Sequence, residues 1–310
     1  MVFDKKTLVF PDETRFEEHT ILTNGDFIIS DRVSLQFGIS TNGRVFAGER
    51  VKMNGNVTAG GDVRVDMFST IRGDVDAEGN VYLGEGTRIG GKLSLRGDLD
   101  VGDDVQIEKG FEAKGWINIR NPIPFVIYIF LYLLELLRLG QSDEVQRILD
   151  EMDTMENEED AAIAVSDVFT FVPADTTIGL QESIVHGNMR IGSGCRILGN
   201  YNVKGSVYVG KGSRIYGALR SSDEMVINDE VEIQGSVGAG GEIRLGAGCK
   251  ILGNLSGKSI QMFQNAMVEG TINAEEGIRF CTEKSEEMKE KVERFENDVA
   301  MVEDVMDLLG

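Results

Sequence analysis

The stretch from Ile71 to Gly110, IRGDVDAEGNVYLGEGTRIGGKLSLRGDLDVGDDVQIEKG, repeats itself every eighteen residues. The segment Ile71-x-Gly73-x-Val75 returns as Ile89-x-Gly91-x-Leu93. A second marker is a glycine that keeps the same phase through six successive units, at Gly25, Gly43, Gly61, Gly79, Gly97 and Gly115. A fixed period of this length is the signature of a repeat architecture, in which each unit stacks on its neighbours.

Each unit contains three pairs of apolar or small residues, and the members of a pair are two positions apart. In one unit the pairs are Val57/Ala59, Val63/Val65 and Ser69/Ile71. A spacing of two places both side chains on one face of a strand. Glycine and charged residues fill the gaps, where we expect the chain to turn at positive φ. The pattern predicts an all-β solenoid, a triangular parallel β-helix of about 18 residues per turn. Its interior is expected to be lined by columns of aliphatic side chains, in which each residue lies above its equivalent in the previous circuit.

The repeat divides the chain into five segments. We predict an N-terminal arm or cap over 1–20, a first solenoid half over 21–120, an inserted helical hairpin over 121–175, a second solenoid half over 176–281 and a C-terminal helix over 282–310. The phase across the insert favours one continuous column of about twelve circuits, and two separate solenoids are the alternative. Six glycines are predicted to stand at the corners of the column, namely Gly43, Gly61, Gly79, Gly97, Gly205 and Gly241.

Within the insert, the segment Phe125–Leu139, FVIYIFLYLLELLRL, is predicted to be a helix that is apolar on almost every side. At 1.5 Å per residue it reaches about 22 Å, which is short of the roughly 30 Å needed to cross a bilayer. Three coverings stay open: a membrane face, the same helix of another subunit, or the wall of its own solenoid. The residues expected to make these contacts are Phe125, Ile127, Tyr128, Phe130, Leu131, Tyr132 and Leu134.

The C-terminal segment carries apolar residues alternately four and three positions apart, which is the spacing of a heptad stripe. This stripe predicts an amphipathic helix that either pairs with a second copy or folds back over the last circuit of the column. Its packing positions are Met288, Val292, Phe295, Val299, Val302, Met306 and, at the end of the stripe, Leu309.

Composition excludes several functional classes. The net charge of −21 argues against nucleic acid as a partner, because phosphates require a basic surface. Cys195 and Cys249 fall in the same inward slot three circuits apart, about 14 Å, which is too far for a disulfide. The spacing of ligating and nucleophilic residues matches no metal site or catalytic triad. We therefore predict no catalytic residues, no cofactor and no metal.

Two local resemblances point to enzymes. Gly205-Ser-Val-Tyr-Val-Gly210-Lys211 begins like a phosphate-binding loop, but Gly212 stands where Ser or Thr should hold magnesium. Val81–Ile89 and Val207–Ile215 resemble the six-residue repeats of hexapeptide acyltransferases. Those enzymes use a histidine base between subunits. The only histidines of this chain, His19 and His186, are expected to be ordinary surface residues, so acyl transfer is kept as the minor alternative.

The alternation of Ile-x-Gly-x-Val with Gly-x-Val-x-Val, as in Val57–Val65 and Ile233–Leu245, resembles the bactofilins over roughly 21–120 and 176–280. The resemblance implies a right-handed triangular solenoid and a polymer-forming cytoskeletal protein. This chain departs from the family pattern in having about twice the circuits, a long insert and a helical tail. The resulting hypothesis is a non-enzymatic scaffold, cytoplasmic or peripheral at the inner face of the membrane, whose partner is itself. A membrane-surface adaptor that never polymerises is a further alternative.

Overall fold

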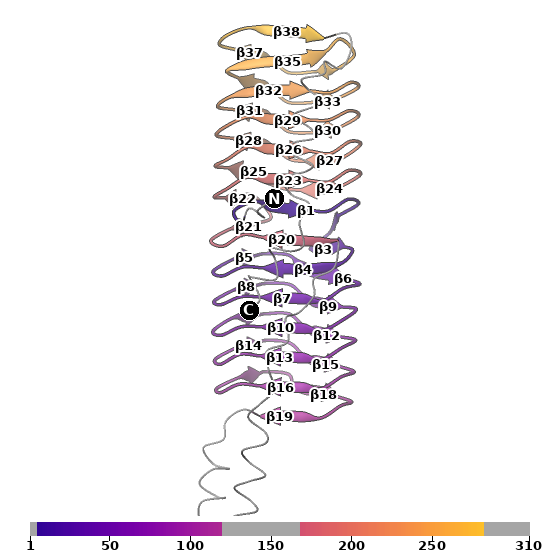
Figure 1. Cartoon of the computed structure of the whole chain (residues 1–310), viewed down its shortest axis with the longest axis vertical. Helices are drawn as coiled ribbons and strands as arrows, with labels where there is room; N and C mark the ends of the chain where they lie inside the picture. The colour runs from indigo at the N-terminus through magenta and orange to yellow at the C-terminus, as the bar shows by residue number, and fades with distance from the viewer. Residues whose placement is uncertain (1–4, 120–167, 282–310) are drawn as a thin grey trace, which may run out of the picture.

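The computed structural model describes residues 5–119 and 168–281 of the chain. Within these residues, 38 short strands form three sheets, which are the three walls of one long column (Figure 1). Within each half the successive strands of a wall are parallel and mostly eighteen residues apart, as in Val63↔Val81 and Val75↔Leu93, with one circuit of seventeen near the upper end, as in Leu255↔Ile272. The predicted β-solenoid of about 18 residues per turn is therefore confirmed. The predicted helices over 121–167 and 282–310 lie outside the described residues.

The first wall, sheet A, contains fourteen strands. From the lower end of Figure 1 to the upper end they are β19 (Ile117–Ile119), β16 (Leu99–Val101), β13 (Val81–Leu83), β10 (Val63–Val65), β7 (Val45–Ala47), β4 (Asp26–Ile29), β20 (Phe169–Val172), β1 (Leu8–Phe10), β23 (Met189–Ile191), β26 (Val207–Val209), β29 (Met225–Ile227), β32 (Glu242–Leu245), β35 (Ser259–Phe263) and β38 (Ile278–Cys281).

The other two walls contain twelve strands each. Sheet B consists of β18 (Phe111–Ala113), β15 (Leu93–Leu95), β12 (Val75–Ala77), β9 (Val57–Ala59), β6 (Gly38–Thr41), β3 (Thr20–Thr23), β2 (Arg15–Glu17), β24 (Arg196–Leu198), β27 (Arg214–Tyr216), β30 (Glu232–Ile233), β33 (Lys250–Ile251) and β36 (Met267–Val268). Sheet C consists of β17 (Gln106–Ile107), β14 (Arg88–Ile89), β11 (Thr70–Ile71), β8 (Lys52–Met53), β5 (Ser34–Leu35), β21 (Thr177–Ile178), β22 (Glu182–Val185), β25 (Asn200–Val203), β28 (Leu219–Ser221), β31 (Val237–Ala239), β34 (Leu255–Gly257) and β37 (Ile272–Ala274).

The core is the interior of the column, where the inward residues of all three sheets form one continuous cluster. In several three-residue strands the two outer residues are buried and the middle one is exposed, as in β9, β10 and β12. This alternation is the direct result of the two-residue side-chain period of a strand. Because each inward residue lies above its equivalent in the previous circuit, the interior columns are mainly aliphatic, with aromatic residues such as Phe16, Phe37 and Tyr201 near the centre of the molecule.

The corner glycines lie directly above one another. The N–H of Gly61 donates to the carbonyl of Gly43 at 3.0 Å, and the next two steps, Gly79 to Gly61 and Gly97 to Gly79, repeat this bond at 3.2 and 3.0 Å. None of these glycines has a positive φ. They are small because the circuits approach closely: a Cβ on Gly43 would lie 2.3 Å from the carbonyl oxygen of Gly25.

The left-handed conformation belongs to a different corner, where most residues are not glycine. Arg32, Arg50, Phe68, Gly86 and Asp104, each eighteen residues after the last, have φ between 52° and 67°. The expected turns at positive φ therefore occur at glycine and charged residues of this other corner, whereas among the marker glycines only Gly25 has a positive φ, of 76°. Close approach of the backbones requires glycine at one corner. At the other corner, residues with a side chain adopt the left-handed conformation and bear its steric strain.

Asp and Asn residues that follow the marker glycines connect successive circuits. The Oδ1 atom of Asp62 accepts the N–H of Asn80 at 2.7 Å, and Asn80 and Asp98 in turn accept the N–H groups of Asp98 and Trp116 at 2.8 Å. Buried or partly buried backbone donors at a corner need such partners. These residues are therefore part of the framework of the column.

The chain does not wind along the column in one direction. After the lower end at β19, the described chain resumes at β20, which lies at the centre and pairs in parallel with β4. The hairpin of β21 and β22 then reverses the direction, and β22 onward builds the upper half. The expectation of one continuous winding through the insert was therefore wrong, although the column itself is continuous (Figure 1).

The N-terminal segment makes the equivalent crossing, from the upper half into the lower half. Strand β1 pairs in parallel with β23, the first sheet A strand of the upper half, and β2 pairs in parallel with β24. The hairpin of β2 and β3 then sends the chain into the lower half. Residues 8–17 thus complete the upper half rather than forming a separate arm, and the solenoid resumes at Phe169 rather than at Thr176. Each half is completed by strands from the other.

The two halves are related by an approximate two-fold axis at the centre of the column. All three sheets change from parallel to antiparallel pairing there, at β1/β20, β2/β3 and β21/β22. The sequence shows the same relation, because Pro11, Thr14 and Gly25 recur as Pro173, Thr176 and Gly187. Each recurrence is 162 residues later (173 minus 11), which equals nine units of eighteen residues. The upper half is therefore a second copy of the lower half, joined to it at the end where each begins.

Candidate functional site: the two ends of the column

The lower end of the column exposes the cross-section of the core. It is formed by β17, β18 and β19, and no described strand pairs with their outer edges. Phe111, Ile117 and Ile119 continue inward columns whose previous members are buried or, at Val101, partly buried, yet they are 48%, 49% and 65% exposed. The only tryptophan, Trp116, lies beside them and is 85% exposed. An apolar disc bounded by open strand edges is a typical site of association.

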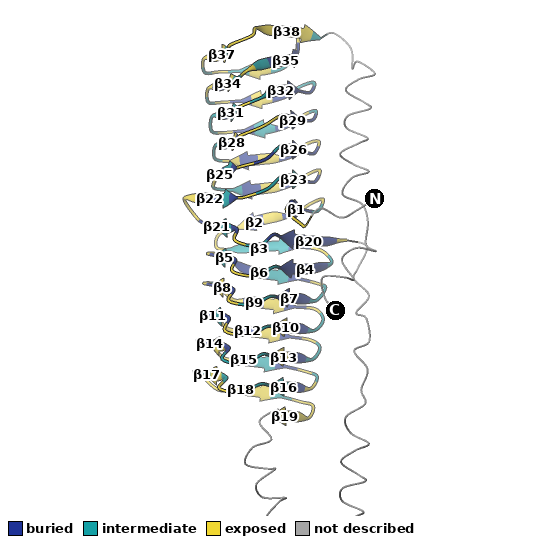
Figure 2. Cartoon of the chain, turned by 60° about the vertical axis from the view of Figure 1, so that its left-hand side comes forward, coloured by how far each residue is buried: buried dark blue, intermediate teal, exposed yellow. Residues whose placement is uncertain are grey.

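The upper end is built in the same way from β36, β37 and β38. Ile272, Ile278 and Phe280 occupy the positions of Phe111, Ile117 and Ile119 in the duplicated half, and they are 37%, 40% and 59% exposed. Figure 2 shows exposed residues in yellow on the terminal strands at both ends. Because the halves wind away from the centre, each end is the last circuit of a half. The two ends therefore present equivalent surfaces of the same strand polarity.

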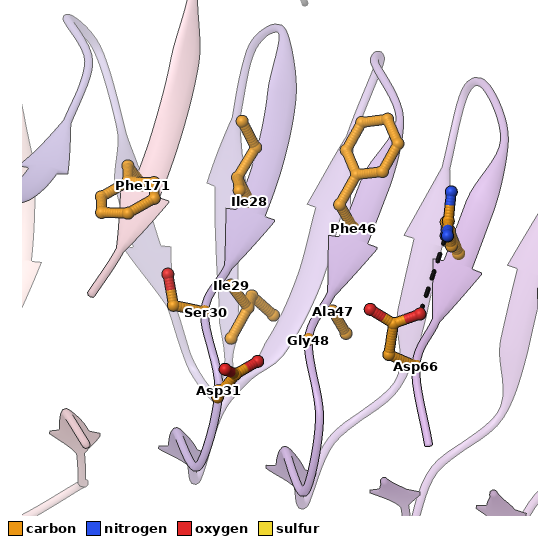
Figure 3. Close-up of a pocket in the computed structure, with 10 residues that line it drawn as sticks. Ile28, Ile29, Ser30, Asp31, Phe46, Ala47, Gly48, Asp66 and Phe171 are labelled. Atoms are coloured by element: carbon orange, nitrogen blue, oxygen red, sulfur yellow. Dashed lines mark ion pairs between the residues drawn. The ribbon is translucent and has the colours of Figure 1, made fainter. Parts of the chain in front are cut away.

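A small hollow lies on the outer face of sheet A. It has a volume of about 190 Å³, and Ile28, Phe46 and Phe171 form its apolar side (Figure 3). Arg64 and Asp66 form an ion pair there, with Nε and Oδ1 3.7 Å apart. Burial raises the pKa of the Asp66 carboxyl, and Arg64 opposes that rise. Its described lining includes one hydroxyl group, that of Ser30, but no histidine or cysteine.

The two histidines lie apart in the fold. His19 is in the turn between β2 and β3, and His186 is in the turn between β22 and β23. His186 lines an open hollow of about 560 Å³ together with Lys5, Lys6 and Asp175. Asp175 is already engaged by Arg32, whose Nε is 2.7 Å from its carboxylate. The described residues that line this hollow include no serine or cysteine.

The buried cysteines are structural. Cys195 and Cys249 lie in the interior, and each thiol donates to a backbone carbonyl, that of Pro11 at 3.2 Å and that of Asn228 at 2.8 Å. Burial raises the pKa of Cys195 to about 12 and that of Cys249 to about 11. Such thiols are poor nucleophiles at neutral pH. Within 5–119 and 168–281, no cluster of three His, Cys, Asp or Glu residues could hold a metal ion.

Two sets of predicted contact residues fall outside the described part of the chain. These are the apolar set within Phe125–Leu134 and the heptad stripe from Met288 to Met306. The six corner glycines are described, and they serve the framework of the column rather than a binding site. Sequence reasoning did not single out the residues of the two ends, because a terminal circuit has the same pattern as an internal one.

No known family model, curated protein or solved structure matches this chain. The residues that the structure describes contain no helix long and apolar enough to span a membrane. The fold itself thus defines the class of the protein, which is a β-solenoid repeat protein made of two fused halves that run in opposite directions along one column.

Proposed function

We propose that this protein is a non-enzymatic structural scaffold that joins end to end with copies of itself. The observation that carries the proposal is the pair of equivalent apolar ends, each with open strand edges. Backbone groups at such an edge and the apolar disc inside it are complementary to a second end of the same kind. The sequence resemblance to the bactofilins, which form cytoskeletal polymers, supports the same conclusion.

The topology also specifies the kind of polymer. Because both ends are last circuits of the same polarity, two molecules that meet end to end must be related by a two-fold axis. The strands on either side of that contact would be antiparallel, as they are at the centre of the column in β1/β20. A chain of such molecules has no overall direction, since reversing it exchanges equivalent ends.

The first test places charges on both ends. In the variant Ile119→Asp/Phe280→Asp, a carboxylate occupies each apolar disc, and its burial in a contact would be strongly unfavourable. We expect filaments or oligomers of the natural protein in negative-stain images and light scattering, and monomers of the variant. Phe68→Asp is the matched control, because Phe68 is 50% exposed but lies on the side of the column. Monodisperse monomers of the natural protein at high concentration would contradict the proposal.

The second test blocks one end only. If lower ends join lower ends and upper ends join upper ends, Ile119→Asp alone should leave discrete dimers held by their upper ends. If lower ends join upper ends, the same variant should be monomeric. Trp116 reports on the lower end in both cases, because covering its exposed indole shifts the fluorescence to shorter wavelength. A filament that forms unchanged from this variant would show that the ends are not the contact.

The absence of catalysis and the place of the polymer are parts of the same proposal. A scaffold should give no heat on titration with acetyl-CoA, whereas a hexapeptide-type acyltransferase should bind it.

We propose that the polymer is cytoplasmic and that the apolar segment 123–139 holds it against a membrane surface. Flotation with liposomes tests this anchor, because a variant lacking 123–139 should stay at the bottom of the gradient. Equal flotation of both chains would remove the membrane from the proposal and leave the end contact untouched.

A further inference from the structure

The outer face of sheet A carries a continuous stripe of side chains that are shielded from solvent. We name it the outer stripe; one outward residue from each of eight successive strands forms it, namely Phe46, Ile28, Phe171, Val9, Arg190, Tyr208, Val226 and Arg244. Arg190 is half-buried, and the other seven are between 0% and 8% exposed. Every described strand belongs to one of the three walls, so none of them lies over this face.

The burial is not a property of the repeat itself. Positions 64 and 226 are equivalent in the two halves, yet Arg64 is exposed and Val226 is 3% exposed. Positions 82 and 244 are also equivalent, yet Tyr82 is 38% exposed and Arg244 is 8% exposed. The outer stripe therefore extends further into the upper half than into the lower one, from β32 to β7. Whatever covers it reaches this face from the side of the upper end.

We propose that the C-terminal segment, 282–310, docks along the outer stripe as an amphipathic helix. The chain arrives at the right place, because Cys281 ends β38 in sheet A, two strands beyond β32. The heptad stripe supplies one apolar residue every 3.5 residues, or about 5.2 Å, while strands are spaced about 4.8 Å apart. Each apolar side chain of the helix can therefore meet one strand of the sheet.

The same arithmetic gives a register. Met288 follows Cys281 by seven residues, about 10 Å of helix, which equals two strand spacings and places it beside Arg244. Val292 then falls beside Val226 and Phe295 beside Tyr208. The stripe ends with Leu309 at Ile28, next to the hollow between Ile28, Phe46 and Phe171, which is large enough for an aliphatic side chain (Figure 3).

Charge and chain connectivity favour this occupant. The segment 283–310 has ten acidic and four basic residues, and the outer stripe includes two arginines and no acid. Arg244 is already paired with Glu242 on its own strand, so the charge argument rests mainly on Arg190. The insert departs from Ile119 at the opposite end and returns at β20 in the centre. The sheet A strands between these two points include β10 and β13, whose Arg64 and Tyr82 are exposed, whereas the C-terminal segment starts from the end toward which the outer stripe extends. A second copy is not needed, because the outer stripe is buried within a single chain. A helix on this wall also leaves the upper end of the column open.

A cysteine pair tests the register in the full-length chain. In a Cys281→Ser background, we expect Val226→Cys and Val292→Cys to form an intramolecular disulfide within minutes of mild oxidation, at any protein concentration. The control pair, Tyr82→Cys with Val292→Cys, should stay reduced. The proposal would be overturned if the first cysteine pair formed no disulfide, or if the control pair formed one equally fast. A disulfide that forms only between two molecules would overturn it as well.

The duplicated halves provide a second test that does not disturb the column. Ile28→Arg and Val226→Arg each introduce the residue that the other half already carries at the equivalent position, Arg190 and Arg64, so the solenoid accommodates them. We expect hydrogen exchange of amides in 285–308 to become at least ten-fold faster in this double variant. Tyr82→Arg, which copies Arg244, is the control and should change nothing. Unchanged exchange in the double variant would overturn the proposal.

Discussion

The central crossing of the chain can be tested at Phe16, the inward residue of β2. Phe16 is 5% exposed and makes edge-to-face contacts with Phe10 and Phe37, with ring centroids 5.5 and 5.0 Å apart. It also begins the file in sheet B that continues through Ile21 and ends at Phe111. If β2 is an integral layer between the halves, Phe16→Ala leaves a cavity at the centre of the molecule.

The expected cost follows from this burial. Removing a fully buried phenylalanine costs about 3–5 kcal/mol, because the transfer free energy is lost and the cavity does not collapse completely. With an m-value of roughly 3 kcal/mol/M, the urea midpoint should fall by about 1–2 M. Phe111→Ala is the matched control at the open end of the same file. Phe111 is 48% exposed, so its removal should cost less than about 1.5 kcal/mol.

The measurement is urea unfolding followed by circular dichroism, with both variants prepared beside the natural protein at a concentration where all three are monomeric. The argument requires Phe16→Ala to lower the midpoint well below that of Phe111→Ala. Equal midpoints, or a smaller effect at Phe16, would mean that residues 8–17 are a peripheral arm. The proposed exchange of strands between the halves would then be wrong.

Two further predictions concern the corners and the thiols. Gly43→Ala should destabilise the column by about 1–3 kcal/mol, because the added Cβ would overlap the backbone of the neighbouring circuit. Phe68→Gly should stabilise it by about 1 kcal/mol, because glycine adopts the left-handed conformation of this position without steric strain. Thermal unfolding of both variants checks these opposite signs. The raised pKa values of Cys195 and Cys249 keep both thiols protonated in the fold between pH 9 and about 11, while the unfolded chain releases these protons. Stability should therefore fall as pH rises from 9, by about 1 kcal/mol for each thiol at pH 10, and Cys195→Ala/Cys249→Ala should flatten that slope.

The ladder of Asp and Asn side chains gives the acidic composition a structural meaning. Asp62 and Asp98 each accept a backbone N–H from the next circuit. Some of the net negative charge therefore belongs to the framework of the solenoid rather than to a binding surface. Such a corner carboxylate has no basic neighbour in the pattern, so the sequence alone does not distinguish it from a solvated acid.

The eighteen-residue period was sufficient to predict the coil. Pairs such as Val63/Val65 alternate inward and outward in any strand, and equal spacing places each pair above its equivalent, as in Val63↔Val81. The three walls and the aliphatic interior follow from these local rules. The open ends did not follow, because Phe111 and Leu93 have the same place in the repeat and differ only in whether another circuit covers them.

The direction of winding was decided by the tertiary structure alone. An inward-outward alternation is the same whether a strand pairs in parallel or antiparallel with its neighbour, so the period carries no information about the order in which circuits stack. Only the pairing of β20 with both β4 and β1 shows that the halves meet at their beginnings. That arrangement, and not the repeat, makes the two ends of the column equivalent.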